Sequence, residues 1–349
     1  MKKIKVGVLG ATGLVGQMLV RLLENHPWFD LSEIAASERS VGKTYLETMK
    51  NRWSASESIP VYAKDLKLKE CSPGLDCYLV FSALDSGVAG PIEEEFAKAG
   101  YAVSSNARNH RMEPDVPLII PEVNADHAAL INAQKKNRAW DGFIVANPNC
   151  STIHLSLALK PLYDSFGIEK VMVTTMQAVS GAGYPGVPSL DSLDNVIPFI
   201  SGEEEKLESE PLKILGSING SSVANAVFSI SAQCNRVSVR HGHMESVSIK
   251  LGRKAETEGI IESLESFNPL EGMGLPSAPR HPIIVRREES RPQPSLDANA
   301  EKGMASIIGR IRRCSILDYR FVVLGHNIIR GAAGGTILNA ELLRAKGYL

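Results

Sequence analysis

The sequence predicts an α/β protein that pairs an N-terminal Rossmann-type parallel sheet with a second, α+β domain built on a mixed sheet. The first 150 residues alternate short, apolar, β-branched runs with helical patterns, as parallel doubly wound sheets do. Beyond that point the β-rich segments become longer and carry alternating polar residues, which is typical of a sheet with one solvated face.

The elements of the first part follow from their local patterns. A glycine-rich turn follows the first apolar run, and Val15, Met18, Leu19 and Leu22 then recur at helical spacing. A helix over 91–99 is expected to end at Gly100, because glycine readily closes a helix. The runs predicted to form strands are 4–9, 31–36, 77–82, 101–104 and 143–146.

The second part begins with a helical pattern over 153–162. The chain ends in a glycine-rich turn and a final helix, whose small residues suit close packing near a ligand. The long β-rich segments between them are 169–179, 237–251 and 304–324.

Composition excludes several classes of function. With 349 residues the chain can bury two cores, and its net charge of −1 gives no basic excess for nucleic acid or an acidic membrane. We find no apolar run long enough to span a membrane and no signal peptide. The five cysteines are scattered without a Cys-x-x-Cys pair, so we expect no disulfide framework, no metal site and a reducing, cytoplasmic location.

A dinucleotide site is predicted where the first strand meets the first helix. Gly10-Ala-Thr-Gly13-Leu-Val-Gly16 stands at that junction, where glycines let the backbone approach a pyrophosphate and the helix start offers free N–H groups. The spacing is GxxGxxG rather than GxGxxG, so the position of the motif carries the argument. The candidate contacts are Gly10, Thr12, Gly13, Leu14 and Val15.

The end of the second predicted strand indicates the type of cofactor. An acidic residue there would accept the ribose hydroxyl of NAD, whereas donors and cations suit the 2′-phosphate of NADP. Glu38 is the one residue that argues for NAD, and it could point to solvent. We therefore predict NADP, bound by Ser37, Arg39, Ser40 and Lys43.

Cys150 is the candidate nucleophile. It lies in Ala146-Asn-Pro-Asn149-Cys150-Ser-Thr, between an apolar strand and an apolar helix, so that the helix start is expected to lower the pKa of its thiol. Most free cysteines are core residues, and the other four are assigned to packing. These are Cys71, Cys77, Cys234 and Cys314.

A thiolate needs an acid–base partner, and the run Val239-Arg-His241-Gly-His243-Met-Glu245 offers two histidines. Two histidines are a weak case for a metal, and nearby Arg236 and Arg240 would repel a cation and attract an anionic substrate. Spacing alone does not choose between His241 and His243.

An ordered set of segments resembles the aspartate-β-semialdehyde dehydrogenase family, most closely its archaeal and fungal branch. The resemblance runs from the first strand to the final helix, so it covers nearly the whole chain. The segments are ATGLVGQ, SSNARNHRM, PEVN, ANPNCSTI, QAVSGAGYPG, SGEEEK, CNRVSVRHGHME, RPQP and GRIR.

The resemblance implies a thioester mechanism on Cys150. The family's acid–base histidine follows its carboxylate-binding arginine by seven residues, which selects Arg236 and His243 over His241. Because seven is odd, a straight strand would put the two on opposite faces, so we expect a bend near Gly242.

The resemblance also implies the remaining roles. Glu203 would bind the substrate ammonium, Lys206 would bind a phosphate, and Gln177 would orient the acyl group. Arg111 and Asn149 match residues on the phosphate side, Asn327 matches the nicotinamide end, and Ser180 and Gly181 are further expected cofactor contacts.

The family further suggests how the chain is organised. Residues 1–149, completed by 327–349, would bind the dinucleotide, and 150–326 would form a catalytic and dimerisation domain. We expect a small-molecule substrate and a homodimer or homotetramer.

The expected reaction is the NADPH-dependent reduction of aspartyl-β-phosphate to the semialdehyde and phosphate. Malonyl-CoA reductase is the nearest alternative, and Glu203 argues mildly against it because that substrate has no ammonium group. Glyceraldehyde-3-phosphate dehydrogenase and N-acetylglutamyl-phosphate reductase share the chemistry, but their cysteine motifs are less similar. A non-catalytic NADP-binding sensor is the alternative from another class.

Overall fold

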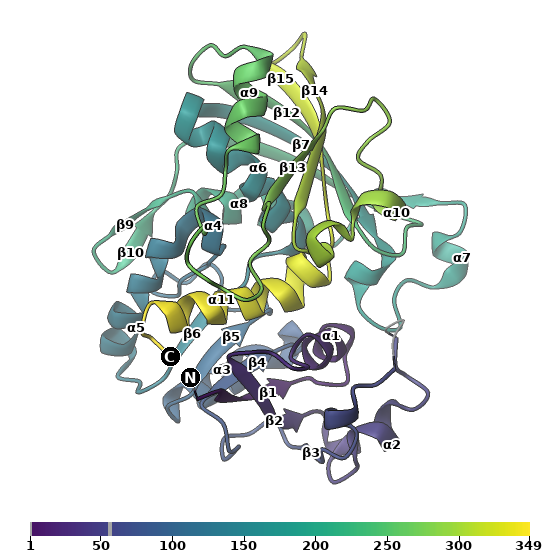
Figure 1. Cartoon of the computed structure of the whole chain (residues 1–349), viewed down its shortest axis with the longest axis vertical. Helices are drawn as coiled ribbons and strands as arrows, with labels where there is room; N and C mark the ends of the chain where they lie inside the picture. Colours follow the sequence, from purple (N-terminus) through teal and green to yellow (C-terminus); the bar gives the residue numbers. More distant parts are fainter. Residues whose placement is uncertain (1, 55–57) are drawn as a thin grey trace.

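The protein contains two large sheets joined by a helical layer, as the computed structural model, which describes residues 2–54 and 58–349, shows (Figure 1). The six-stranded sheet is built from the first part of the chain and the seven-stranded sheet from the second. The predicted fold class is confirmed.

The six-stranded sheet is entirely parallel and has the order β3-β2-β1-β4-β5-β6. This is the order of doubly wound nucleotide-binding sheets, in which ligands bind where the strand order reverses, here between β1 and β4. Its strands are β1 (Ile4–Leu9), β2 (Phe29–Ala35), β3 (Leu68–Lys69), β4 (Leu79–Ser82), β5 (Ala102–Ser105) and β6 (Phe143–Ala146).

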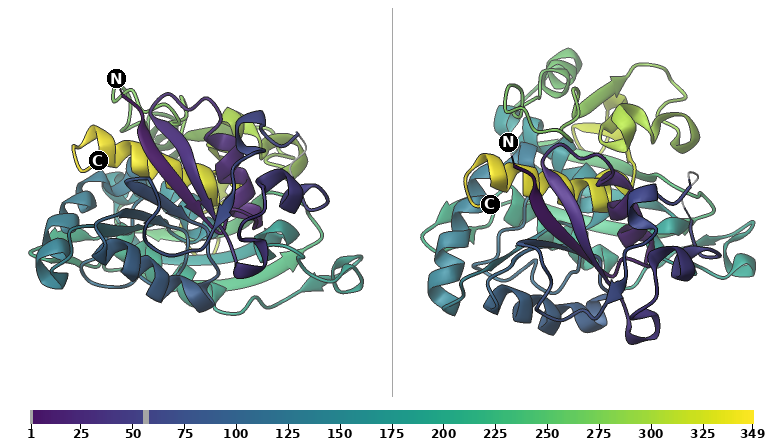
Figure 2. Two further views of the ribbon diagram at one scale, coloured as in Figure 1. Left: turned by 90° about the horizontal axis from the view of Figure 1, so that it is seen from below. Right: turned by 60° about the horizontal axis from the view of Figure 1, so that its bottom comes forward.

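The last helix of the chain returns to this first sheet. Ile337, Leu338 and Leu342 of α11 (Gly334–Ala345) share one core with Val6 and Val8 of β1. Figure 2 shows α11, in yellow, lying beside the first strands. The other helices of this part are α1 (Leu14–Leu22), α2 (Tyr45–Met49), α3 (Ser86–Lys98), α4 (Pro121–Asn124) and α5 (Leu130–Arg138).

The seven-stranded sheet is mixed, with the order β13-β14-β15-β12-β7-β11-β8. Its strands are β7 (Ile168–Ala178), β8 (Val196–Ile197), β11 (Ser229–Val237), β12 (His243–Leu251), β13 (Ile283–Arg286), β14 (Ser306–Arg313) and β15 (Tyr319–Gly325). One face packs against α6 (Cys150–Phe166), α8 (Glu203–Ile214) and α9 (Thr257–Glu265) in a continuous apolar core. Smaller elements are the hairpin of β9 (Ser217–Asn219) and β10 (Ser222–Ala224), α7 (Ser189–Ser192) and α10 (Pro294–Asp297).

Two predicted helices begin too late. The helix expected over 91–99 is α3, which starts at Ser86 because the amides of Val88 and Ala89 already bond to the carbonyl of Asp85. Pro91 therefore lies inside the helix. The helix expected over 153–162 is α6, which starts at Cys150 because the Asn149 side chain caps it.

The β-rich segment 237–251 contains the end of β11 and the whole of β12. β11 pairs in parallel with one side of β7, and β12 pairs antiparallel with the other side, so the residues between them cross the end of β7. Gly242, with φ +97°, lies in this crossing. The expected bend is therefore confirmed, and the crossing places the side chains of Arg236 and His243 on the same face of the sheet.

Within the described ranges, no helix is both long and apolar enough to cross a membrane.

Candidate active site

The candidate nucleophile lies where the two sheets meet. β6 of the parallel sheet ends at Ala146, and three residues later Asn149 caps α6, the helix that supports the mixed sheet. The Asn149 Oδ1 atom accepts hydrogen bonds from the amides of Ser151 at 3.0 Å and Thr152 at 3.3 Å. Cys150 is therefore fixed as the first residue of the helix.

The last helical segment of the chain packs directly against Cys150. A π-helical turn over Ile329–Ala333 brings Gly331 so close that a Cβ added there would lie 2.7 Å from the Cys150 Cβ. No side chain fits at that position, so the chain end helps to fix the nucleophile.

A buried carboxylate gathers the residues around the nucleophile. The Glu203 side chain accepts hydrogen bonds from Asn149 Nδ2 at 2.9 Å, Gln177 Nε2 at 3.2 Å and Lys206 Nζ at 2.6 Å. Arg236 lies within electrostatic range of both Cys150 and Glu203. These contacts bring together four of the predicted catalytic and substrate residues around one carboxylate.

The thiol itself does not have the low pKa that its place at a helix start led us to expect. Burial, together with the negative charge of Glu203, raises the pKa of Cys150 to about 12. Arg111, Lys206 and the Ser151 amide act in the opposite direction but do not compensate. The thiol of Cys150 is therefore protonated in this arrangement.

One peptide group holds both Arg236 and His243. The Arg236 Nη1 atom donates to the carbonyl of Ala178 at 2.8 Å, and the Ala178 amide donates to His243 Nδ1 at 3.0 Å. A Cβ on Gly181 would lie 2.8 Å from Arg236 Nη1 and 3.0 Å from His243 Nε2, so a larger residue there would have to displace one of these side chains. Gly181 therefore lies directly beside Arg236 and His243.

The hydrogen bond from Ala178 also defines the protonation of His243. Burial and the charge of Arg236 hold the pKa of His243 well below its usual value, so the ring is neutral. Because Nδ1 accepts a hydrogen bond, the proton lies on Nε2, which is buried and has no partner among the described residues. His243 therefore presents a hydrogen-bond donor to the site.

The second histidine of the cluster belongs to another group. His241 Nδ1 lies 3.0 Å from Ser180 Oγ, to which the Asn327 Nδ2 atom also donates at 2.9 Å. The Asn327 Oδ1 atom accepts from the Gly242 amide at 2.9 Å. Ser180 and Asn327, both predicted cofactor contacts, thus lie together near the crossing that precedes His243.

Arg111 is tied to the nucleophile by a residue that the sequence reasoning missed. Its Nη1 atom donates to Glu210 Oε1 at 2.9 Å, and the Asn149 amide donates to Glu210 Oε2 at 2.7 Å. The signal was present in the sequence, because Glu203, Lys206 and Glu210 follow one another at helical spacing.

The glycine loop has the form that a pyrophosphate requires. Gly10 adopts φ +74°, and a Cβ on Gly16 would lie 2.2 Å from the Gly10 carbonyl oxygen, so the loop folds tightly onto the start of α1. The first turn of α1 carries no acidic residue, which leaves the helix start favourable for an anion. Gly13 is exposed, and Thr12, Leu14 and Val15 are partly exposed.

The predicted 2′-phosphate contacts follow β2 in a short 3₁₀ turn, Glu38–Ser40. Ser37, Arg39 and Lys43 are exposed, and Lys43 Nζ donates to the Arg39 carbonyl at 3.2 Å. Ser40 is buried, so it is less available to a ligand than the sequence suggested. Among the described residues, no group of three or more His, Cys, Asp or Glu side chains is arranged to hold a metal ion.

Comparison with known proteins shows the family. The chain matches the family model described as semialdehyde dehydrogenase, NAD binding domain, over residues 5–131. It matches the model described as semialdehyde dehydrogenase, dimerisation domain, over residues 159–330. The chain belongs to the semialdehyde dehydrogenase family.

Similar members of the semialdehyde dehydrogenase family extend over the full chain. An aspartate-semialdehyde dehydrogenase of Archaeoglobus fulgidus is 53% identical over 98% of this chain and 98% of that protein. One from Methanothermobacter thermautotrophicus is 49% identical over 97% of this chain and 99% of that protein. The crystal structure of aspartate semialdehyde dehydrogenase with NADP from Candida albicans has a TM-score of 0.92 at 42% identity and covers 100% of both chains.

The raised pKa of Cys150 in this semialdehyde dehydrogenase gives a first test of the site. Replacing Glu203 with Gln removes the negative charge that opposes thiolate formation, so the pH midpoint of alkylation by iodoacetamide should fall by about one pH unit. Glu205→Gln, on an exposed position of the same helix, should leave the midpoint where it is. An unchanged or higher midpoint in Glu203→Gln would show that Glu203 does not act on the thiol.

Proposed function

We propose that this protein is an NADP-dependent aspartate-semialdehyde dehydrogenase. In the biosynthesis of lysine, threonine and methionine it would reduce L-aspartyl-4-phosphate to L-aspartate 4-semialdehyde and phosphate. The observation that carries the proposal is the set of charges around Cys150, with Arg236 and Glu203 suited to an amino acid and Arg111 and Lys206 to a phosphate. Named relatives at 43–53% identity over nearly the full chain support it.

The substrate would contact both positively and negatively charged side chains of the site. Arg236 can grip the α-carboxylate through its planar guanidinium, and Glu203 can accept the ammonium group. The acyl phosphate would then lie toward Lys206, Arg111 and Asn149. Gln177, held by Glu203, would hydrogen bond the acyl group beside Cys150.

Substrate binding would also activate the nucleophile. Glu203 raises the pKa of the Cys150 thiol, and an ammonium group that pairs with Glu203 neutralises this effect. The phosphate-binding cations remain in place and favour the thiolate. The pKa of the Cys150 thiol would therefore fall when the correct substrate pairs with Glu203.

The first half-reaction forms a thioester on Cys150. Its sulfur attacks the acyl carbon, the bond from that carbon to the phosphate oxygen breaks, and the thiol proton ends on the departing phosphate. In the second half, NADPH supplies the hydride that reduces the thioester carbon. The carbon–sulfur bond then breaks, and His243, whose Nε2–H faces the site as a donor, assists the return of a proton to the sulfur.

The cofactor would bind along the glycine loop and β2. Gly10, Thr12, Gly13, Leu14 and Val15 would hold the pyrophosphate at the start of α1. Ser37, Arg39 and Lys43, with Ser40 behind them, would bind the 2′-phosphate, and Ser180, Gly181 and Asn327 would face the nicotinamide. The structure of the Candida albicans relative with NADP supports this choice of cofactor.

A spectrophotometric assay tests the proposed function. Aspartate semialdehyde, phosphate and NADP should give NADPH absorbance at 340 nm, and replacing NADP with NAD should slow the reaction. Cys150→Ala should abolish turnover while it leaves NADPH binding, followed by fluorescence, intact. Faster oxidation of NADPH with malonyl-CoA than with aspartyl phosphate would identify the other reductase, and no turnover with either would indicate a sensor.

His243 and His241 are expected to have different roles, which substitution of each can distinguish. His243→Ala should lower kcat by roughly 10²–10⁴-fold, the usual contribution of an acid–base group. His241→Ala removes a contact to Ser180 instead and should mainly raise the KM for NADP. The larger loss of kcat in His241→Ala would reverse the two assignments.

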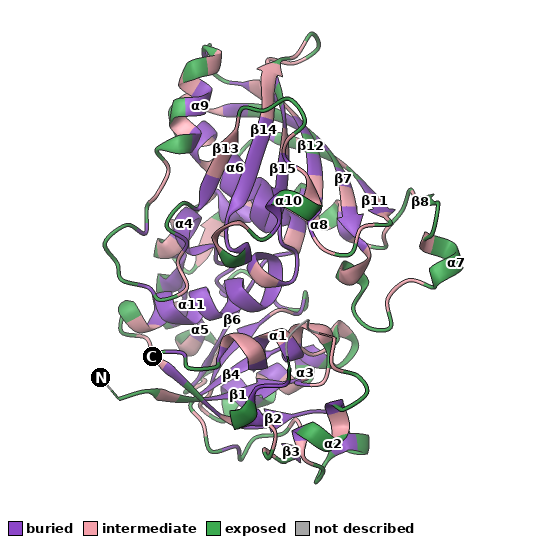
Figure 3. Ribbon diagram, turned by 45° about the vertical axis from the view of Figure 1, so that its right-hand side comes forward, coloured by how far each residue is buried: buried purple, intermediate pink, exposed green. Residues whose placement is uncertain are grey.

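The domain organisation and assembly belong to the same proposal. Residues 1–149 and 327–349 would form the dinucleotide-binding domain, and 150–326 the catalytic and dimerisation domain. An arm around α7 and β8 projects from the molecule and is largely exposed (Figure 3). Its large apolar side chains are exposed, and so is Met172 on β7. The exposed apolar residues of the arm are Tyr184, Leu190, Leu193, Val196 and Phe199.

Such a surface fits a second copy of the chain, and we propose a homodimer or a dimer of dimers. The five free cysteines favour a cytoplasmic location.

Charge placed on this arm should weaken the assembly. Leu193→Asp with Phe199→Asp puts two carboxylates on a face that would otherwise be buried between copies. Size-exclusion chromatography with light scattering should then show a monomer where the wild type is a dimer or tetramer. Ile316→Asp changes a highly exposed residue in the β14–β15 turn and serves as the control. A wild-type monomer would refute the proposed assembly.

A further inference from the structure

One face of α8 carries more charged residues than the proposed reaction uses. Glu203, Lys206, Glu210 and Lys213 follow one another at intervals of three, four and three residues, which places them on one side of the helix. Glu203 and Lys206 belong to the substrate site described above. Glu210 and Lys213 are almost completely buried, and their role is still open.

Glu210 connects the two sides of the site. Its Oε2 atom accepts from the Asn149 amide at 2.7 Å, directly before Cys150. Its Oε1 atom accepts from Arg111 Nη1 at 2.9 Å. A single buried carboxylate thus spans the distance between the start of the nucleophile's helix and the arginine on the phosphate side.

Lys213 fixes the loop that carries this arginine. Its Nζ atom donates to the carbonyls of Arg111 at 2.7 Å, Glu113 at 2.7 Å and Val116 at 2.8 Å. An ammonium group has three donors, so all of them are used on one loop. Burial lowers the pKa of Lys213 to about 8, because an ammonium group is costly to remove from water. The three carbonyls are its hydrogen-bond partners in this buried position.

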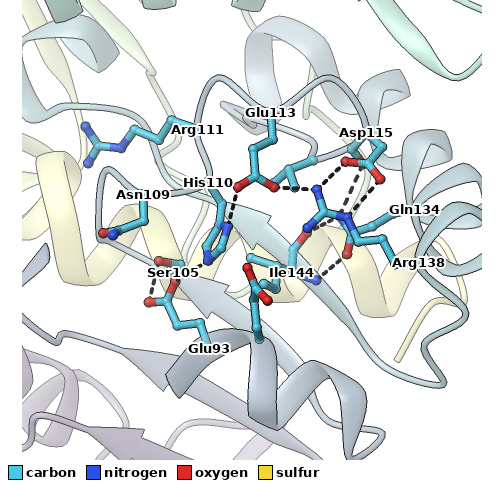
Figure 4. A network of polar contacts seen from close by, with 12 residues as sticks. Glu93, Ser105, Asn109, His110, Arg111, Glu113, Asp115, Gln134, Arg138 and Ile144 are labelled. Atoms are coloured by element: carbon cyan, nitrogen blue, oxygen red, sulfur yellow. Dashed lines mark hydrogen bonds and ion pairs between the residues drawn. The ribbon is translucent and has the colours of Figure 1, made fainter. Parts of the chain in front are cut away.

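Neighbouring residues of the loop that carries Arg111 are held by a separate network of ion pairs. Figure 4 shows His110 between Glu93 and Glu113, with Glu113 and Asp115 held by Arg138. Arg111 extends away from this network (Figure 4). Its Nη2 atom donates to the Asn106 carbonyl at 2.8 Å, and its Nε atom is buried without a partner among the described residues.

We propose that Glu210 and Lys213 are positioning residues that hold Arg111 in register with Cys150 for the phosphate half of the reaction. The proposal rests on the function proposed above. In that half-reaction the sulfur and a phosphate oxygen displace one another at the same acyl carbon. Arg111, which would hold the phosphate, must therefore be placed accurately relative to the sulfur. Hydride transfer to or from the same carbon does not require the phosphate-side arginine.

The two half-reactions can be measured separately in the oxidative direction. Without phosphate, aspartate semialdehyde adds to Cys150, hydride passes to NADP, and a stopped-flow burst reports one thioester per active site. Added phosphate then attacks the thioester carbon and releases the thiolate, which allows steady-state turnover. The ratio of the burst rate to the rate of phosphate-dependent turnover is therefore compared between each variant and the wild type.

Glu210→Gln keeps the shape of the side chain but removes its charge. We expect its burst rate to stay within about threefold of wild type, while turnover at fixed phosphate falls about 10- to 100-fold and the KM for phosphate rises. Glu205→Gln, exposed on the same helix, should change neither quantity. If Glu210→Gln has no cooperative melting transition, Glu210→Asp, which keeps the charge but shortens the reach, takes its place with the same expectation.

Equal losses in both half-reactions, or no loss in either, would overturn the positioning role. A wild-type protein that gives neither a burst nor turnover would instead refute the proposed function, so the two failures are distinguishable.

Discussion

The active site depends on one constraint, which is that charges removed from water must be paired. An unpaired buried ion costs several kcal/mol, so each carboxylate and ammonium group in this region needs partners in a defined place. Glu203 satisfies this through Asn149, Gln177 and Lys206, and Glu210 through Asn149 and Arg111. Two of these bonds come from Asn149, which caps α6, so charge pairing ties α8 to the helix that begins at Cys150.

The same pairing explains the electrostatic state of the free protein. A carboxylate beside the thiol is unfavourable for a nucleophile, yet Glu203 holds three other groups in place. Burial and, to a smaller extent, this carboxylate keep the thiol protonated, and His243 is neutral because it is buried next to Arg236. Neither of the two candidate catalytic groups is charged in this arrangement. A site of this kind protects its cysteine from alkylation and oxidation, because these reactions require the thiolate.

Much of this architecture could be predicted from the sequence. The strands 4–9 and 143–146 were found exactly because buried parallel strands are short, continuous apolar runs. The place of Cys150 at a helix start was also visible, but the pKa of its thiol was not, because this depends on burial and on Glu203, which is distant in the sequence. Periodicity alone could not show that β11 and β12 lie on opposite sides of β7. Glu210 and Lys213 were overlooked because a charged helix face usually indicates exposure to solvent.

The position of α11 has a consequence for folding during synthesis on the ribosome. The helix that completes the core around β1 is made only after the whole mixed sheet. At about 5–20 residues per second, a ribosome needs roughly 10–40 s to pass from Cys150 to the C-terminus. Until then the apolar residues of β1 lack the part of their core that α11 supplies, and Gly331 has not yet reached Cys150. A chain that stops before α11 would therefore expose part of this core and leave Cys150 without the contact that helps to fix it.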